Sequence, residues 1–115
     1  MELVIDIYQT TETFPPFKAR SLVDQIRRAS VSIASNIAEG AGRQTVKEFI
    51  RFLHMAQGSV SELDTQLELT LRLNYLKKKD WGRLDKQMVK IDKMVTGLIR
   101  QQRGISKEQK VRSEE

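Results

Sequence analysis

Apolar side chains recur every three to four residues along most of this chain, which is the spacing of one face of an α-helix. The first such stretch begins near Met1 and ends before Phe14-Pro15-Pro16, because proline lacks the amide donor that a helix needs. The second runs from Leu22 to Ile37, and we expect Gly40 to end it as a C-terminal cap. These two stretches predict a short helix followed by a longer one.

Two further helices follow. Thr45 and Glu48 have the spacing of a capping box, so we expect a third helix to begin there and to extend to about residue 76. Asp80 is a good N-cap for a fourth helix with a regular apolar face. After it, residues 104–115 contain few strongly apolar residues, and we expect a disordered basic and polar tail behind a helical domain over residues 1–103.

Four amphipathic helices joined by short turns predict an all-α fold, an antiparallel up-and-down four-helix bundle. The helix lengths are unequal, because at 1.5 Å per residue the third would extend roughly 48 Å and the first only about 20 Å. We therefore expect that the natural chain begins earlier or that another subunit covers the uncovered surface. In a homo-oligomer, a neighbouring subunit should then partly cover Leu69, Leu73 and Leu76.

Few residues in the chain could support catalysis. It has no cysteine and one histidine, which excludes disulfides, thiolate zinc sites and a cysteine nucleophile. Di-iron bundles need Glu-x-x-His pairs on two helices, whereas His54 is alone, and we expect it at the edge of the core. The acids Glu62, Asp64 and Glu68 do not converge on one helix face. We predict no enzyme, cofactor or metal; a metal or small-molecule enzyme is the least favoured alternative.

No signal peptide or apolar stretch of roughly 20 residues is present, so we expect no membrane association and a cytoplasmic location. Hydrogen-bonding residues crowd the apolar face of the second helix and are matched by others on the third. We predict that they form a buried polar network that fixes the register of the two helices, with contact to a ligand or partner as the alternative. Its candidate members are Gln25, Asn36, Glu39, Glu62 and Gln66.

Basic residues exceed acidic ones by 20 to 15, giving a net charge of +5, and they are clustered along the chain. If the second helix, the turn after it and the fourth helix line one surface, these clusters would offer a wide contact to nucleic-acid phosphates. An ordinary solvated basic face is the alternative. The candidate residues are Arg27, Arg28, Arg43, Lys47, Arg51, Lys77, Lys78, Lys79, Arg83, Lys86 and Lys90, with Lys93 beyond them.

Three segments together resemble a known family: Gln25 to Ile33, then Asn36-Ile37-Ala38-Glu39-Gly40, then Gly58-Ser59-Val60-Ser61-Glu62-Leu63. They resemble the four-helix-bundle proteins encoded by intervening sequences of bacterial 23S rRNA genes, over about residues 3 to 100. The resemblance implies a ring, typically a pentamer, and an association with rRNA genes. Family members usually carry more residues before the position of Met1.

Charge and resemblance together predict a non-enzymatic, oligomeric bundle that binds RNA or a ribonucleoprotein through a basic surface. A related branch is similar to the accessory variability proteins of diversity-generating retroelements. The alternative function is therefore that of a scaffold that binds a reverse transcriptase.

Overall fold

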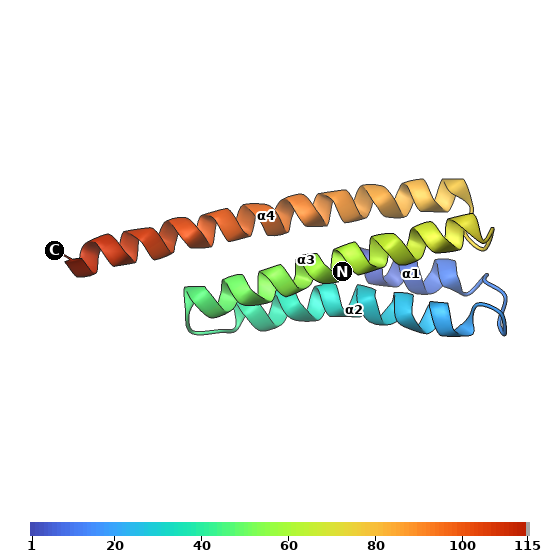
Figure 1. The fold of residues 1–115 in the computed structure, drawn as a ribbon, viewed down its shortest axis with the longest axis horizontal. Helices are drawn as coiled ribbons and strands as arrows, with labels where there is room; N and C mark the ends of the chain where they lie inside the picture. The colour runs from blue at the N-terminus through green and yellow to red at the C-terminus, as the bar shows by residue number, and fades with distance from the viewer. Residues whose placement is uncertain (115) are drawn as a thin grey trace.

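Four α-helices make up residues 1–114, the part of the chain that the computed structural model describes, and no strand occurs among them. They are α1 (Glu2–Thr11), α2 (Arg20–Ala41), α3 (Val46–Arg72) and α4 (Lys78–Glu114). The helices lie side by side in a body of 62 × 21 × 19 Å, and the chain reverses direction at each connection (Figure 1). The prediction of an all-α chain with four helices is confirmed.

Helix boundaries follow the predicted signals only in part. The Thr45 side chain accepts a hydrogen bond from the Glu48 amide at 3.2 Å, as a capping residue should. Gly40, however, does not end α2, which continues to Ala41 with Gly42 as its C-cap. Gly40 is buried, and a Cβ added to it would lie 2.8 Å from Cβ of Phe52. This glycine therefore allows close packing of α2 on α3.

The fourth helix is longer at both ends than predicted. It begins at Lys78, so Asp80 lies in its first turn rather than at the N-cap. It also continues to Glu114, where the sequence predicts a disordered tail from residue 104; Glu115 lies outside the described residues. The tail is rich in Lys, Arg, Glu and Gln, which are good helix formers and can extend an existing helix without packing.

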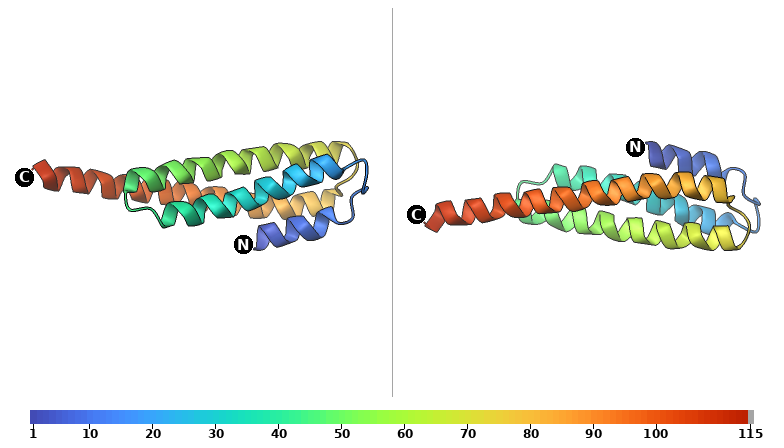
Figure 2. Two further views of the ribbon diagram at one scale, coloured as in Figure 1. Left: turned by 90° about the horizontal axis from the view of Figure 1, so that it is seen from below. Right: turned by 90° about the horizontal axis from the view of Figure 1, so that it is seen from above.

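The helices are arranged around a square in which neighbours along its edges touch. α2 packs on α3, α3 on α4, and α1 on both α2 and α4, whereas α2 and α4 are diagonal to each other. α1 runs along only part of the bundle, so the N-terminus lies near mid-length (Figures 1 and 2). The bundle therefore has a four-helix half, which includes α1, and a three-helix half around the α2–α3 turn.

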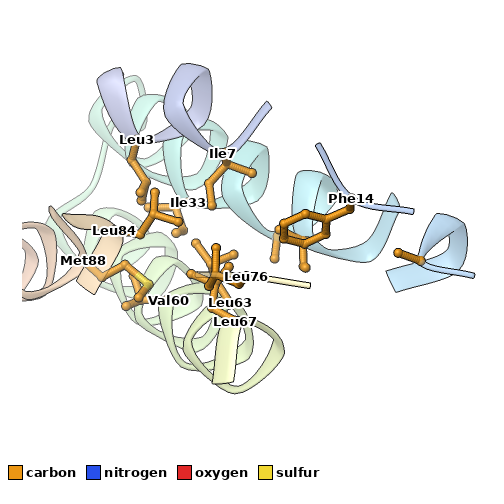
Figure 3. Close-up of a cluster of buried hydrophobic side chains, with 13 residues drawn as sticks. Leu3, Ile7, Phe14, Ile33, Val60, Leu63, Leu67, Leu76, Leu84 and Met88 are labelled. Atoms are coloured by element: carbon orange, nitrogen blue, oxygen red, sulfur yellow. The ribbon is translucent and has the colours of Figure 1, made fainter. Parts of the chain in front are cut away.

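Each half has its own hydrophobic core. The larger core joins all four helices and includes Leu3, Ile7 and Leu63, which are at most 1% exposed (Figure 3). The smaller core, in the three-helix half, consists of Leu53, Val95 and Ile99, with partly buried side chains around it. None of the described helices is long and apolar enough to span a membrane.

The expectation that another subunit covers the late part of α3 is wrong for one residue. Leu76 lies in the turn after α3, is only 3% exposed, and belongs to the larger core of its own chain. Leu69 and Leu73 are 48% and 52% exposed and remain available to a partner.

Candidate nucleic-acid interface

The predicted basic surface shared by α2 and α4 does not form. These two helices occupy diagonal positions, and within residues 1–114 no Cα atom of one lies within 8 Å of a Cα atom of the other. Arg43, Lys47 and Arg51 lie around the α2–α3 turn, at one end of the bundle, whereas Lys77 to Lys79 lie around the α3–α4 turn, at the other (Figure 1). The candidate residues therefore divide into separate groups, which differ in how far the fold itself uses their charge.

Arg27 contributes to the attachment of α1. Its Nε donates to Thr11 Oγ1 at 3.0 Å, and a terminal nitrogen donates to the backbone carbonyl of Tyr8 at 3.2 Å. Its guanidinium also lies 4.6 Å from the centre of the Tyr8 ring. Because two of its three side-chain nitrogens donate within the chain and the side chain is partly buried, Arg27 has a structural role in this conformation.

Arg43 and Arg51 lie against the same aromatic ring. Their guanidinium carbons are 4.8 and 4.9 Å from the centre of the Phe52 ring. Each also forms an ion pair on its own side, Arg43 with Glu39 at 2.8 Å and Arg51 with Glu48 at 3.3 Å. These pairs are exposed, so they reduce but do not remove the positive charge that this end presents.

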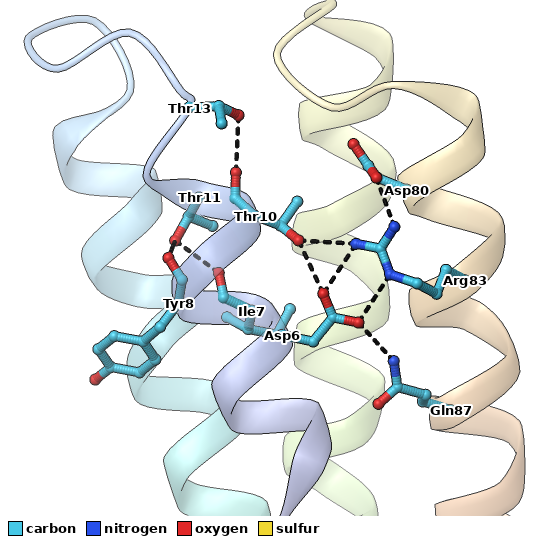
Figure 4. A network of polar contacts seen from close by, with 9 residues as sticks. All are labelled: Asp6, Ile7, Tyr8, Thr10, Thr11, Thr13, Asp80, Arg83 and Gln87. Carbon is cyan, nitrogen blue, oxygen red and sulfur yellow. Dashed lines mark hydrogen bonds and ion pairs between the residues drawn. The ribbon is translucent and has the colours of Figure 1, made fainter.

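Arg83 belongs to a polar cluster that joins α1 to α4, made of Asp6, Thr10, Asp80, Arg83 and Gln87 (Figure 4). Two Arg83 nitrogens donate to the two carboxylate oxygens of Asp6, each at 2.9 Å, and a third donates to Asp80 at 2.6 Å. Gln87 Nε2 donates to Asp6 at 2.7 Å. The Arg83 hydrogen bonds lower the pKa of Asp6, against the effect of burial, and Asp6 in turn raises the pKa of Arg83.

A row of cations without such partners runs along α4. Lys79, Lys86, Lys90 and Lys93 follow the three-four spacing of one helix face, together with Arg83, and all four lysines are exposed. None of them forms an ion pair within residues 1–114. Seven-residue steps from Lys93 extend the same face to Arg100 and Lys107. We call Lys79, Lys86, Lys90, Lys93, Arg100 and Lys107 the α4 basic row.

Arg100 and Lys107 were missed from the candidate residues, and Lys107 lies in the tail that was expected to be disordered. The signal that could have found them is the unbroken spacing from Lys79 onward. Acidic residues take a neighbouring side of α4: Asp85 and Asp92 line a shallow surface hollow with Asp64 of α3, and Lys93 of the basic row borders the same hollow. Burial, followed by the charges of Asp85 and Glu68, raises the pKa of Asp64. The basic row and the acidic side of α4 therefore meet at Lys93.

The remaining candidates are exposed and dispersed. Arg28 lies on α2, Lys47 opens α3, and Lys77 and Lys78 precede or begin α4; none of them forms an ion pair with another described residue.

The predicted polar network is divided into two small groups. Asn36 donates to the Ser32 carbonyl and hydroxyl at 2.9 and 3.1 Å, and the Ser32 hydroxyl lies 2.9 Å from that of Ser59 on α3. Separately, Gln66 donates to Glu62 at 3.2 Å, and its own carbonyl oxygen is buried without a partner in the described residues. Gln25 and Glu39 are exposed and join neither group. The α2–α3 contact therefore uses the two serines, which were not among the candidates.

His54 is exposed rather than enclosed. Its Nδ1 lies 3.3 Å from Gln57 Oε1 and its Nε2 3.4 Å from Arg103 of α4. Across residues 1–114, no three His, Asp or Glu side chains are grouped so that they could hold a metal ion.

The sequence profile of the 23S rRNA-intervening sequence proteins matches residues 1–97. The chain belongs to this family. A solved structure from Bacteroides thetaiotaomicron, a protein of unknown function from the S23 ribosomal protein family, has the same fold. The two are 23% identical with a TM-score of 0.72, over 84% of this chain and 87% of that one. No functionally curated protein matches the sequence significantly. The predicted family is confirmed, and the intervening-sequence fold accounts for the four helices.

Proposed function

We propose that this intervening-sequence protein is a non-enzymatic, oligomeric, antiparallel helical bundle that binds RNA, alone or in a ribonucleoprotein, through the α4 basic row. The single observation that carries this proposal is the row itself. Its six cations lie on one helix face over about 42 Å, at 1.5 Å per residue, and form no ion pair with described residues.

The chemistry of the row favours the nucleic-acid backbone over the bases. Five of its six residues are lysines, and none is the Asn or Gln that reads the edge of an adenine. Flexible lysines attract phosphates as point charges. The expected binding is therefore strong at low salt and weakly dependent on sequence.

Assembly is the second part of the proposal. Met55, Leu69 and Leu73 are about half exposed and lie on one side of α3 and its C-cap, with Glu62 between Met55 and the two leucines. The two exposed leucines, one helical turn apart, favour contact between protein chains. We propose a homo-oligomer, a pentameric ring as the family resemblance implies, which would place several α4 rows around one particle in the cytoplasm.

The same exposed apolar side of α3 favours the alternative function, a scaffold that binds a protein such as the reverse transcriptase of a diversity-generating retroelement. In that case the α4 row would assist docking or solubility. The alternative predicts co-purification with such an enzyme and no salt-dependent gain of RNA.

Light scattering after size exclusion tests the proposal directly. The purified protein is measured alone and with total RNA, at low and at high salt. The proposal predicts a mass of several chains that gains RNA at low salt and loses it at high salt. A monomer would contradict the assembly, and a complex indifferent to RNA at both salts would contradict the binding.

A further inference from the structure

The most exposed large apolar side chain among the described residues is Phe17, at 88% exposure; the next, Ile5, is at 59%. Phe17 lies in the connection between α1 and α2, at the same end of the bundle as the α3–α4 turn (Figure 1). A single exposed apolar residue is ordinary on a protein surface. Phe17 differs from an ordinary exposed apolar residue in two respects: its loop is held rigidly, and charged residues lie beside it.

The loop holds Phe17 in place. Phe14, three residues before it, is 5% exposed and packs on Tyr75, with ring centres 6.2 Å apart. Ala19, two residues after it, is fully buried, and its amide donates to the Pro15 carbonyl at 3.1 Å. Pro15 and Pro16 restrict the backbone between these anchors. The aromatic ring is therefore presented to solvent from a fixed point.

Phe17 also borders a shallow surface hollow of about 340 Å³ on α2. The other residues lining the hollow supply groups that a nucleotide uses: Arg20 and Arg28 offer guanidiniums, and Ser21, Asp24 and Gln25 offer hydrogen-bonding edges. Neither arginine has an ion-pair partner within residues 1–114, and Lys18 adds a further exposed cation.

The charges around the Phe17 hollow favour a ligand that carries both a phosphate and an unpaired base. Apart from Arg27, which attaches α1, residues 17–28 contain three basic side chains and one acidic, Asp24. As a carboxylate, Asp24 only accepts hydrogen bonds, so it repels phosphate and suits the amino group of a base instead. An aromatic face next to arginines is the combination with which proteins bind single-stranded nucleic acids, by stacking bases and pairing phosphates.

We infer that Phe17 and its hollow, with Arg20 and Arg28, form a binding site for a single-stranded RNA nucleotide, whose base stacks on the Phe17 ring. This inference rests on the proposed RNA binding and adds to it a preference for unpaired over duplex RNA. The α4 basic row contacts backbone of either kind, whereas a base can reach Phe17 only when it is unstacked.

The test compares two fluorescent probes, a single-stranded RNA of about a dozen nucleotides and a duplex of the same length, by anisotropy with the full chain. Phe17→Ala should weaken single-strand binding by about 10-fold, the equivalent of roughly 1.4 kcal/mol for one lost stack, and change duplex binding by less than about twofold. Because Phe17 is exposed, the variant should fold. Phe17→Leu separates stacking from apolar contact, because leucine is apolar but cannot stack, and it should weaken single-strand binding as Phe17→Ala does. Phe17→Trp keeps an aromatic ring and should bind the single strand about as well as the wild type.

Each other outcome overturns the inference in an identifiable way. If the wild type binds both probes and Phe17→Ala binds them equally well, the nucleotide site is wrong and the proposed function stands. If the wild type binds neither probe, the proposed function and the inference fall together. If Phe17→Ala leaves RNA binding intact but changes the oligomer mass in light scattering, Phe17 belongs to a contact between copies.

Discussion

The two halves of the bundle are built from the same α3 and α4 but differ in what covers them. In the four-helix half, α1 adds Leu3 and Ile7 to the core and attaches to α4 through the Asp6–Arg83 ion pair. In the three-helix half, Leu53, Val95 and Ile99 have partly buried neighbours instead of a fourth helix. The comparison indicates that the short α1 concentrates stability at one end, and that the other end is closed mainly by close α2–α3 packing.

The largest expected loss of stability comes from substitution of two leucines of α3, which compares the two halves of the bundle directly. Leu63 and Leu53 are both fully buried, one in each core. Leu63→Ala should lower the free energy of unfolding by about 4 kcal/mol and Leu53→Ala by about 2–3 kcal/mol, because a cavity collapses more easily where fewer elements enclose it. Urea denaturation measures both. Equal losses, or a larger loss for Leu53→Ala, would mean that the halves are equally well packed.

The next largest loss of stability is expected where α2 packs closely on α3. Gly40→Ala should cost about 1–3 kcal/mol, because the new Cβ would meet the Phe52 Cβ at 2.8 Å, an atom fixed close to the backbone. Gly58→Ala is the matched control, since a Cβ there has no atom within 4 Å, and it should stabilise α3 by about 0.5–1 kcal/mol. Thermal unfolding of the two variants should therefore move in opposite directions. A stabilised Gly40→Ala variant would show that the contact can relax.

The attachment of α1 predicts an acid-sensitive contribution at the four-helix end. The Arg83 hydrogen bonds hold the pKa of Asp6 below its unfolded value, so this contribution is present above about pH 4 and is lost as the pH falls through the lowered pKa. Asp6→Asn should lower the free energy of unfolding by about 1–2 kcal/mol at neutral pH, as expected for the loss of charged hydrogen bonds. The stability of this variant should also fall less steeply than that of the wild type as the pH is lowered.

Glu12→Gln provides the control for Asp6→Asn, because Glu12 is exposed at the end of the same helix and forms no ion pair with a described residue. Its effect should stay below about 0.5 kcal/mol. Denaturant curves from neutral pH to about pH 2 compare the three proteins. Parallel loss of stability in wild type and Asp6→Asn would show that Asp6 does not contribute this acid dependence.

The smallest effect concerns Asp64, between the acids of α3 and α4. Burial and the charges of Asp85 and Glu68 raise its pKa, so its folded pKa lies above the unfolded one and its charge costs stability at neutral pH. Asp64→Asn should therefore stabilise the protein by about 0.5 kcal/mol or less at pH 7. The gain should shrink as the pH falls and Asp64 becomes protonated. A destabilised variant would indicate a favourable role for the carboxylate.

Features with a local signal were predicted well from the sequence. Apolar spacing predicted the four helices, and the Thr45 cap was confirmed. Gly40 was misread because a glycine that allows close packing near a helix end looks the same in sequence as a C-cap. The tail was misread because low apolar content was taken to mean disorder, although its residues favour helix.

The site was less predictable because it depends on partners distant in sequence. Asp6 and Arg83 are 77 residues apart, so nothing local showed that Arg83 would be engaged within the chain. The diagonal placement of α2 and α4 likewise follows from packing and separates basic residues that the sequence predicts on one surface. The α4 row, in contrast, was largely present in the spacing, and only its extension to Lys107 depended on the helix continuing beyond residue 103.

The most direct test of the central claim compares two double variants that each remove two positive charges. Lys86→Gln/Lys90→Gln removes members of the α4 basic row, and Arg43→Gln/Arg51→Gln removes cations that already pair with Glu39 and Glu48. RNA affinity is measured for both and for wild type across a salt series. We expect the lysine variant to weaken binding and to reduce the salt dependence by about one to two units of log-log slope, with a smaller change for the arginine variant. Equal effects of the two variants, or none for the lysine variant, would contradict binding through α4.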